Sequence, residues 1–136
     1  MIADSCVTIH SKKNFTLSEK RSSVHFTNLQ NLEIEQIIVD GCAIMAELRC
    51  DYLVNIREIR KSVFVELKGS DVEYALKQLE ASYKMLSEDC YSTTLWIVSS
   101  GRCPLTSTSV QLAKLKFQRR YGVQLIIRNS PVEHVL

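Results

Sequence analysis

The succession of strand-like and helix-like segments between residues 32 and 127 constrains the fold of this chain more than any other feature. Three apolar strand candidates come first, followed by a helix, a strand, a second helix and a last strand, at residues 32–39, 49–54, 62–68, 70–86, 93–99, 107–120 and 123–127. Successive strands with short connections pair antiparallel, whereas strands joined through a helix usually become parallel neighbours. The order predicts an α/β fold with a mixed sheet.

Both helices carry end signals in the sequence. Ser70, with Glu73 three residues later, forms a capping box that predicts the start of the first helix. Gly122 stands where a left-handed residue would end the second helix. A further capping box over residues 16–19 predicts a helix before the strands, with Glu19 as a cap.

Length and composition favour one domain over residues 1–136. A chain of 136 residues can bury one sizeable core, and 4 Gly and 2 Pro leave little material for a linker. No apolar run approaches the roughly 18 residues that span a bilayer, and no secretory signal is visible at the N-terminus. We therefore expect a cytoplasmic protein without a membrane partner.

The cysteines give no pattern of a disulfide framework or a zinc site. Their number, 5, is odd, and no two of them form a Cys-x-x-Cys pair. We expect them to be small buried residues in a reducing compartment.

Two carboxylates and one amine gather on two neighbouring strand candidates. Side chains alternate faces along a strand, so Glu66 and Lys68 point the same way, and Asp51 meets them if the two strands pair. Such a set suits a hard divalent cation, which takes carboxylate oxygens as ligands. The alternative is a surface ion pair, of Glu66 with Lys68 or Arg49. The apolar neighbours of Glu66 argue for burial and against that alternative, because buried charges need a metal or a tight network.

The charge distribution favours a polyanionic partner. Between residues 90 and 132 there are six basic residues and no acidic residue, and four of the six lie in the second helix: Lys114, Lys116, Arg119 and Arg120. A basic half beside an acidic half fits a polyanion that lies across one face of a small domain. A solvated helix face is the alternative explanation of the same charge run.

These features resemble the PD-(D/E)XK nuclease superfamily, which has the restriction-endonuclease-like fold. The resemblance rests on Asp51 at the start of one strand, Glu66-x-Lys68 at the end of the next, and a helix directly afterwards. It implies a single domain with a mixed sheet, an αβββαβ core over about residues 17–99, and an additional helix and strand. Cys50 precedes Asp51 where the family has the proline that names its motif.

The resemblance also implies residue roles. Asp51, Glu66 and the carbonyl of Leu67 would bind Mg²⁺, for which Mn²⁺ can substitute, and Lys68 would activate water or stabilise charge on the phosphate. Gln78 lies where several nuclease subgroups place a catalytic glutamine, although an ordinary helix position is the alternative. Asp40 would only form a turn with Gly41.

The expected function is therefore that of a magnesium-dependent nuclease, in particular an endonuclease, that hydrolyses phosphodiester bonds of nucleic acid, DNA in particular. The alternative is a catalytically idle nuclease-fold module that binds nucleic acid or a protein partner within a larger assembly. A homodimer, or a subunit of a defence or mobile-element complex, fits the small size of the chain.

Overall fold

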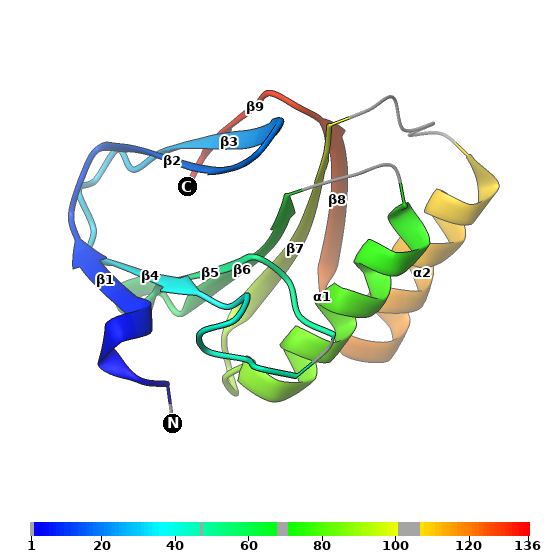
Figure 1. Ribbon diagram of the computed structural model, residues 1–136, viewed down its shortest axis with the longest axis horizontal. Coiled ribbons are helices and arrows are strands. Elements are labelled where there is room, and N and C mark those ends of the chain that lie inside the picture. The colour runs from blue at the N-terminus through cyan, green and yellow to red at the C-terminus, as the bar shows by residue number, and fades with distance from the viewer. Residues whose placement is uncertain (1, 47, 68–70, 101–106) are drawn as a thin grey trace.

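Two β-sheets and two helices form the architecture in the computed structural model, which describes residues 2–46, 48–67, 71–100 and 107–136 (Figure 1). The larger sheet contains, in spatial order, β1 (Val7–His10), β4 (Ile34–Ile38), β5 (Tyr52–Ile56), β6 (Lys61–Leu67), β7 (Ser92–Ser99) and β8 (Gln124–Asn129). The smaller sheet contains β2 (Asn14–Glu19), β3 (Ser22–Thr27) and β9 (Val132–Val135). The helices are α1 (Val72–Leu86) and α2 (Thr108–Tyr121), with short 3-10 turns at Asp4–Cys6 and Arg57–Ile59.

The larger sheet is mixed, which confirms the coarse prediction of a single α/β domain with a mixed sheet. β4, β5 and β6 pair antiparallel, and β6, β7 and β8 pair parallel. Strand pairing changes from antiparallel to parallel where α1 and α2 connect successive strands. A helical crossover returns the chain to the same end of the sheet, so the next strand runs parallel. The last strand of the expected core and the additional helix and strand correspond to β7, α2 and β8.

The helix predicted from residues 16–19 is wrong. These residues belong to β2, which pairs antiparallel with β3 through a two-residue turn at Lys20 and Arg21. Phe15, Leu17, Val24 and Phe26 are buried at every second position, which is the period of a strand. A hairpin therefore takes the place of the first helix of the expected αβββαβ order.

The capping box of the first helix is displaced by one residue. Asp71 is the N-cap of α1, and its side chain accepts a hydrogen bond from the backbone N–H of Tyr74 at 3.0 Å. Aspartate caps as well as serine does, and its negative charge interacts favourably with the helix dipole. Ser70 lies outside the described residues. Gly122 ends α2 with φ +67°, as its position predicted.

Two apolar layers hold the sheets and helices together. On one face of the larger sheet, Phe64, Leu95 and Ile97 pack against α1 and α2. On the other face, Val63, Val65 and Leu67 pack against the smaller sheet. Figure 1 shows this three-layer order, with the helices on one side of the larger sheet and β2, β3 and β9 on the other. Burial of both faces explains the nearly continuous apolar sequence of β6 and β7.

The cysteines correct the expectation from composition. Cys6 and Cys42 form a disulfide with a Cα–Cα distance of 5.7 Å across a sequence separation of 36 residues. Cys50 is a buried thiol, Cys90 is exposed, and Cys103 lies outside the described residues. Spacing alone could not reveal a pair that the tertiary fold brings together. Disulfides persist in oxidising compartments, so this pair argues against the expected reducing one.

Among the helices of the described residues, none has the length and apolar character needed to cross a membrane.

Candidate metal centre

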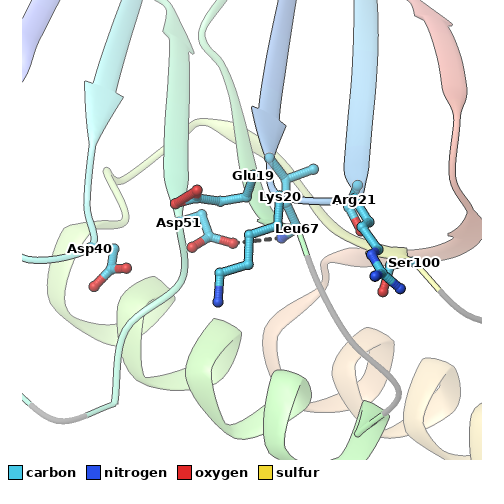
Figure 2. A pocket seen from close by; sticks show the side chains of 8 residues that line it. Glu19, Lys20, Arg21, Asp40, Asp51, Leu67 and Ser100 are labelled. Carbon is cyan, nitrogen blue, oxygen red and sulfur yellow. Dashed lines mark hydrogen bonds between the residues drawn. The ribbon is translucent and has the colours of Figure 1, made fainter.

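A cavity of about 350 Å³ lies between the turn of the β2–β3 hairpin and one end of the larger sheet. It is lined by Glu19, Lys20, Arg21, Ser22, Asp40, Asp51, Leu67 and Ser100. Figure 2 shows how residues from the hairpin turn meet those at the ends of the strands. The ends of β6 and β7 that border the cavity are their carboxyl ends, where ligands commonly bind in α/β sheets.

Asp51 is held in place by β6. Its backbone N–H donates to the carbonyl of Val65 at 3.1 Å, and its Oδ2 accepts from the backbone N–H of Leu67 at 2.7 Å (Figure 2). Asp51 is also hydrogen-bonded to the residue after β4, because its backbone carbonyl accepts from the N–H of Val39 at 3.0 Å. Only 6% of Asp51 is exposed. Its carboxylate therefore has a fixed position at the edge of the cavity.

Three carboxylates from distant parts of the chain converge beside Asp51. One oxygen each from Glu19, Asp40 and Asp51 lies within 4.8 Å of the others. Mg²⁺ and Ca²⁺ bind oxygen ligands at about 2.0–2.6 Å, so two ligands on opposite sides of one ion are about 4–5 Å apart. Carboxylate oxygens are also the ligands that these hard cations prefer. The donor set and its spacing therefore fit a hard divalent cation.

The pKa of Tyr52 is raised in part by the negative charges of this region. Burial raises that pKa above its usual value, and the charges of Glu19, Asp51 and Asp40 raise it further. Negative neighbours oppose ionisation of the phenol, and the same field would attract a cation.

One of the three carboxylates already has a positively charged neighbour. Nε of Arg49 lies 2.5 Å from Oδ1 of Asp40, and both side chains are partly exposed. Asp40 precedes Gly41, whose φ of +70° lies in the left-handed region, and the disulfide at Cys42 follows. The prediction that Asp40 only forms a turn missed its place in the cavity.

Glu66 lies next to Asp51 in the sheet but not in the cavity. Val65 pairs with Tyr52 and also accepts from the backbone N–H of Asp51, so Glu66 directly follows the β6 residue that Asp51 contacts. Glu66 shares the face of β6 that Phe64 turns toward the helices, and its side chain is 0% exposed. It belongs neither to the cavity lining nor to the three-carboxylate group. A metal-binding role for Glu66 stays a prediction.

The pKa of the Cys50 thiol is influenced by the charges of Asp51 and Glu66. Burial raises the pKa of the Cys50 thiol to about 12, with a further increase from the negative charges of Glu66 and Asp51 and a decrease from the hydrogen bond with Ser82. A thiol in this state is protonated at neutral pH and acts as a small packing residue rather than as a nucleophile or metal ligand.

The other predicted site residues fall in three places. Lys68 lies outside the described residues. Leu67 lines the cavity and donates its N–H to Asp51, and a metal-binding role for its carbonyl stays a prediction. Gln78 is 6% exposed in α1, and its Nε2 donates to the carbonyl of Arg49 at 2.9 Å. That contact supports the segment before Asp51, so a catalytic role for Gln78 also stays a prediction.

The basic residues of α2 are not brought to the cavity. Lys114, Lys116, Arg119 and Arg120 lie on α2, on the opposite side of the larger sheet from the hairpin (Figure 1). Arg120 lies 3.8 Å from a carboxylate oxygen of Glu80, and Lys116 lines a groove between the helices. Among the described residues, the positive side chains that line the cavity are Lys20 and Arg21, which the charge distribution did not single out. The alternation of apolar and polar residues on either side of this pair was the sequence signal for a hairpin with a cationic turn.

Comparison of this chain with protein-family models, curated proteins and solved structures found no match.

Proposed function

We propose that this chain is a magnesium-dependent nuclease that hydrolyses phosphodiester bonds of nucleic acid, DNA in particular, in the cavity beside Asp51. The observation that supports this function best is the convergence of Glu19, Asp40 and the fixed carboxylate of Asp51 within 4.8 Å. Bringing three carboxylates together costs repulsion that a divalent cation would remove.

In the proposed hydrolysis, the cation and the side chains of the protein would have different roles. A bound Mg²⁺ polarises a phosphoryl oxygen and lowers the pKa of its water. Asp51, Glu19 and Asp40 would hold the ion, and Asp51 would fix its position relative to the sheet. Lys68, as the amine of the Glu-x-Lys sequence, would stabilise negative charge that develops on the phosphate. Hydrolysis then breaks the bond between phosphorus and a sugar oxygen, water supplies the new oxygen on phosphorus, and a proton from water ends on the leaving sugar oxygen.

Glu66 would influence the electrostatic potential of the cavity without lining it. It is fully buried and follows Val65, whose carbonyl accepts from the backbone N–H of Asp51, so a second carboxylate lies at the same end of β6. In its ionised form, Glu66 would add to the negative potential that attracts a cation. The bases of α2 would contact more distant phosphates of a long substrate, since they lie across the sheet from the cavity.

A second candidate function follows from the contact between Arg49 and Asp40. A guanidinium that partly neutralises the acidic group lowers its need for a metal ion. In that case the chain would be a catalytically idle module that binds nucleic acid or a protein partner within a larger assembly.

Cleavage assays separate the two functions. Single-stranded DNA, duplex DNA and RNA are incubated with Mg²⁺, Mn²⁺ or a chelator, using the wild type, Asp51→Asn and Lys68→Met. Asp89→Asn is the matched control, because Asp89 is exposed and does not line the cavity. The nuclease proposal predicts metal-dependent cleavage that Asp51→Asn lowers by at least about 100-fold. Binding without cleavage of any substrate would favour the idle module.

A further inference from the structure

The turn that connects β2 to β3 has an unusual sequence for its geometry. Glu19 pairs with Ser22, which leaves Lys20 and Arg21 as a two-residue hairpin turn. Lys20 has a φ of +47°, in the left-handed region. Two-residue hairpin turns favour Gly, Asn and Asp because these residues accept positive φ most readily. The turn geometry therefore does not explain the presence of two long cationic side chains at these positions. Residues that depart from the local sequence preferences of their backbone geometry concentrate at functional sites.

These two cations border the carboxylates without forming ion pairs. Lys20 and Arg21 line the same cavity as Glu19, Asp40 and Asp51. Within the described part of the chain, no ion pair links Lys20 or Arg21 to a carboxylate. Figure 2 shows the Lys20 side chain extending alongside Asp51 and the Arg21 side chain extending toward Ser100. The charges of Lys20 and Arg21 are thus not neutralised by a carboxylate of the described residues, which suits an anionic ligand beside a bound metal.

Ser22 provides an independent sign of a ligand. Only 2% of Ser22 is exposed, it lines the cavity, and its Oγ has no hydrogen-bond partner among the residues that the structure describes. A buried hydroxyl without a partner is costly, so such groups call for an explanation. A phosphate oxygen is a strong acceptor for a hydroxyl donor.

We propose that Lys20, Arg21 and Ser22 form a phosphate clamp that holds a backbone phosphate of the nucleic-acid strand next to the carboxylates. The guanidinium of Arg21 can contact a phosphate with two parallel hydrogen bonds, and Lys20 supplies a point charge. The clamp rests on the proposed function, and it assigns the main phosphate contact to the hairpin turn instead of to α2.

Strand binding measured apart from catalysis tests the clamp. A labelled single-stranded DNA oligonucleotide is titrated with protein in Ca²⁺, and fluorescence anisotropy is recorded at several salt concentrations. Lys20→Met/Arg21→Met is compared with Lys114→Met/Lys116→Met, which removes the same charge from α2. We expect the turn variant to bind about tenfold more weakly and its slope of log K against log salt to flatten by about 1 to 1.5. The α2 variant should change less on both measures.

Ser22→Ala tests the hydroxyl separately. The hydroxyl forms no hydrogen bond with the described part of the chain, so its removal should leave the fold intact and weaken oligonucleotide binding several-fold. Ser18→Ala, at an exposed position of the same hairpin, is the matched control and should bind as the wild type does.

Three outcomes overturn the clamp: no oligonucleotide binding by the wild type, an unchanged affinity and salt slope in the turn variant, or a larger loss in the α2 variant. Failure of the clamp is distinct from failure of the nuclease proposal. If the wild type cleaves DNA and the turn variant keeps its KM, the clamp is wrong and the nuclease proposal stands. If the turn governs binding but no substrate is cleaved, the clamp stands and the nuclease proposal is wrong.

Discussion

The carboxylate of Asp51 accepts a hydrogen bond from the backbone N–H of Leu67 at 2.7 Å, and this bond ties the start of β5 to the end of β6. This hydrogen bond lies at the end of the two strands, where the cavity begins. The same bond orients the other carboxylate oxygen of Asp51, because Oδ2 is fixed by β6. Asp51 thus serves both the structure of the sheet end and the geometry of the three-carboxylate group.

Substitutions of Asp51 should separate these two roles. Asp51→Ala removes the acceptor of the Leu67 N–H, and we expect it to lower the free energy of unfolding by about 1–3 kcal/mol. Asp51→Asn retains a side-chain oxygen acceptor and should cost less than Asp51→Ala. Urea unfolding followed by the fluorescence of Trp96, which is 3% exposed, measures both. Equal stability of the two variants would contradict this account of the hydrogen bond.

The disulfide between Cys6 and Cys42 should contribute strongly to stability. It closes a loop with a sequence separation of 36 residues, and the chain-entropy model gives about 4 kcal/mol for such a loop. We expect Cys6→Ser to lower the free energy of unfolding by about 2–4 kcal/mol. Cys90→Ser changes an exposed free cysteine and should stay within about 0.5 kcal/mol of the wild type. Similar denaturant midpoints for the two variants would show that the disulfide contributes little.

Gln78 should support the segment before Asp51 without taking part in the reaction. Its Nε2 donates to the Arg49 carbonyl, whereas its buried Oε1 has no hydrogen-bond partner in the described ranges of the chain. Gln78→Met loses the first contact but also removes the costly buried oxygen, so we expect a change in unfolding free energy of no more than about 1 kcal/mol. Turnover should stay near that of the wild type. A tenfold loss of kcat at unchanged stability would instead establish the catalytic role that the sequence predicts.

His134 should make stability depend on pH. Burial lowers its pKa below the usual value of 6.5, and the charge of Lys61 lowers it further. The folded state therefore disfavours the protonated ring, so the stabilising contribution is complete above about pH 6.5 and is lost as the pH falls through the folded pKa. His134→Phe keeps a ring beside Trp96, which lies 5.1 Å from the His134 ring, and removes the titration. Its unfolding free energy should fall less between pH 7 and pH 5 than that of the wild type.

The sequence predicted the middle of the fold better than its beginning. Strong periodicity and end signals located β4 to β8 and both helices, and Gly122 proved to be the C-cap of α2. The hairpin of β2 and β3 was missed because Thr16 and Glu19 match a capping box at the same time as Phe15 and Leu17 alternate with polar residues. A local pattern of four residues cannot decide between helix and strand when pairing with a distant segment determines the outcome.

The candidate site was predictable only in part, for a related reason. Asp51 could be singled out because it stands next to a strand that pairs with the Glu66 strand. Glu19 and Asp40 join it only through tertiary contacts between the hairpin and the end of β4, which no local pattern encodes. The sequence singled out the positive charges of α2 as the contact for a polyanion, whereas the fold places Lys20 and Arg21 at the cavity.

Binding of Mn²⁺ to the protein alone tests whether Asp51 belongs to a metal centre. A titration followed by the electron paramagnetic resonance signal of free Mn²⁺ compares the wild type, Asp51→Asn and the control Asp89→Asn. We predict that the wild type and Asp89→Asn bind the ion with the same affinity and that Asp51→Asn weakens binding by at least about tenfold, because a metal ligand loses its charge. Absence of binding by the wild type, or equal affinity in Asp51→Asn, would contradict a metal centre at Asp51.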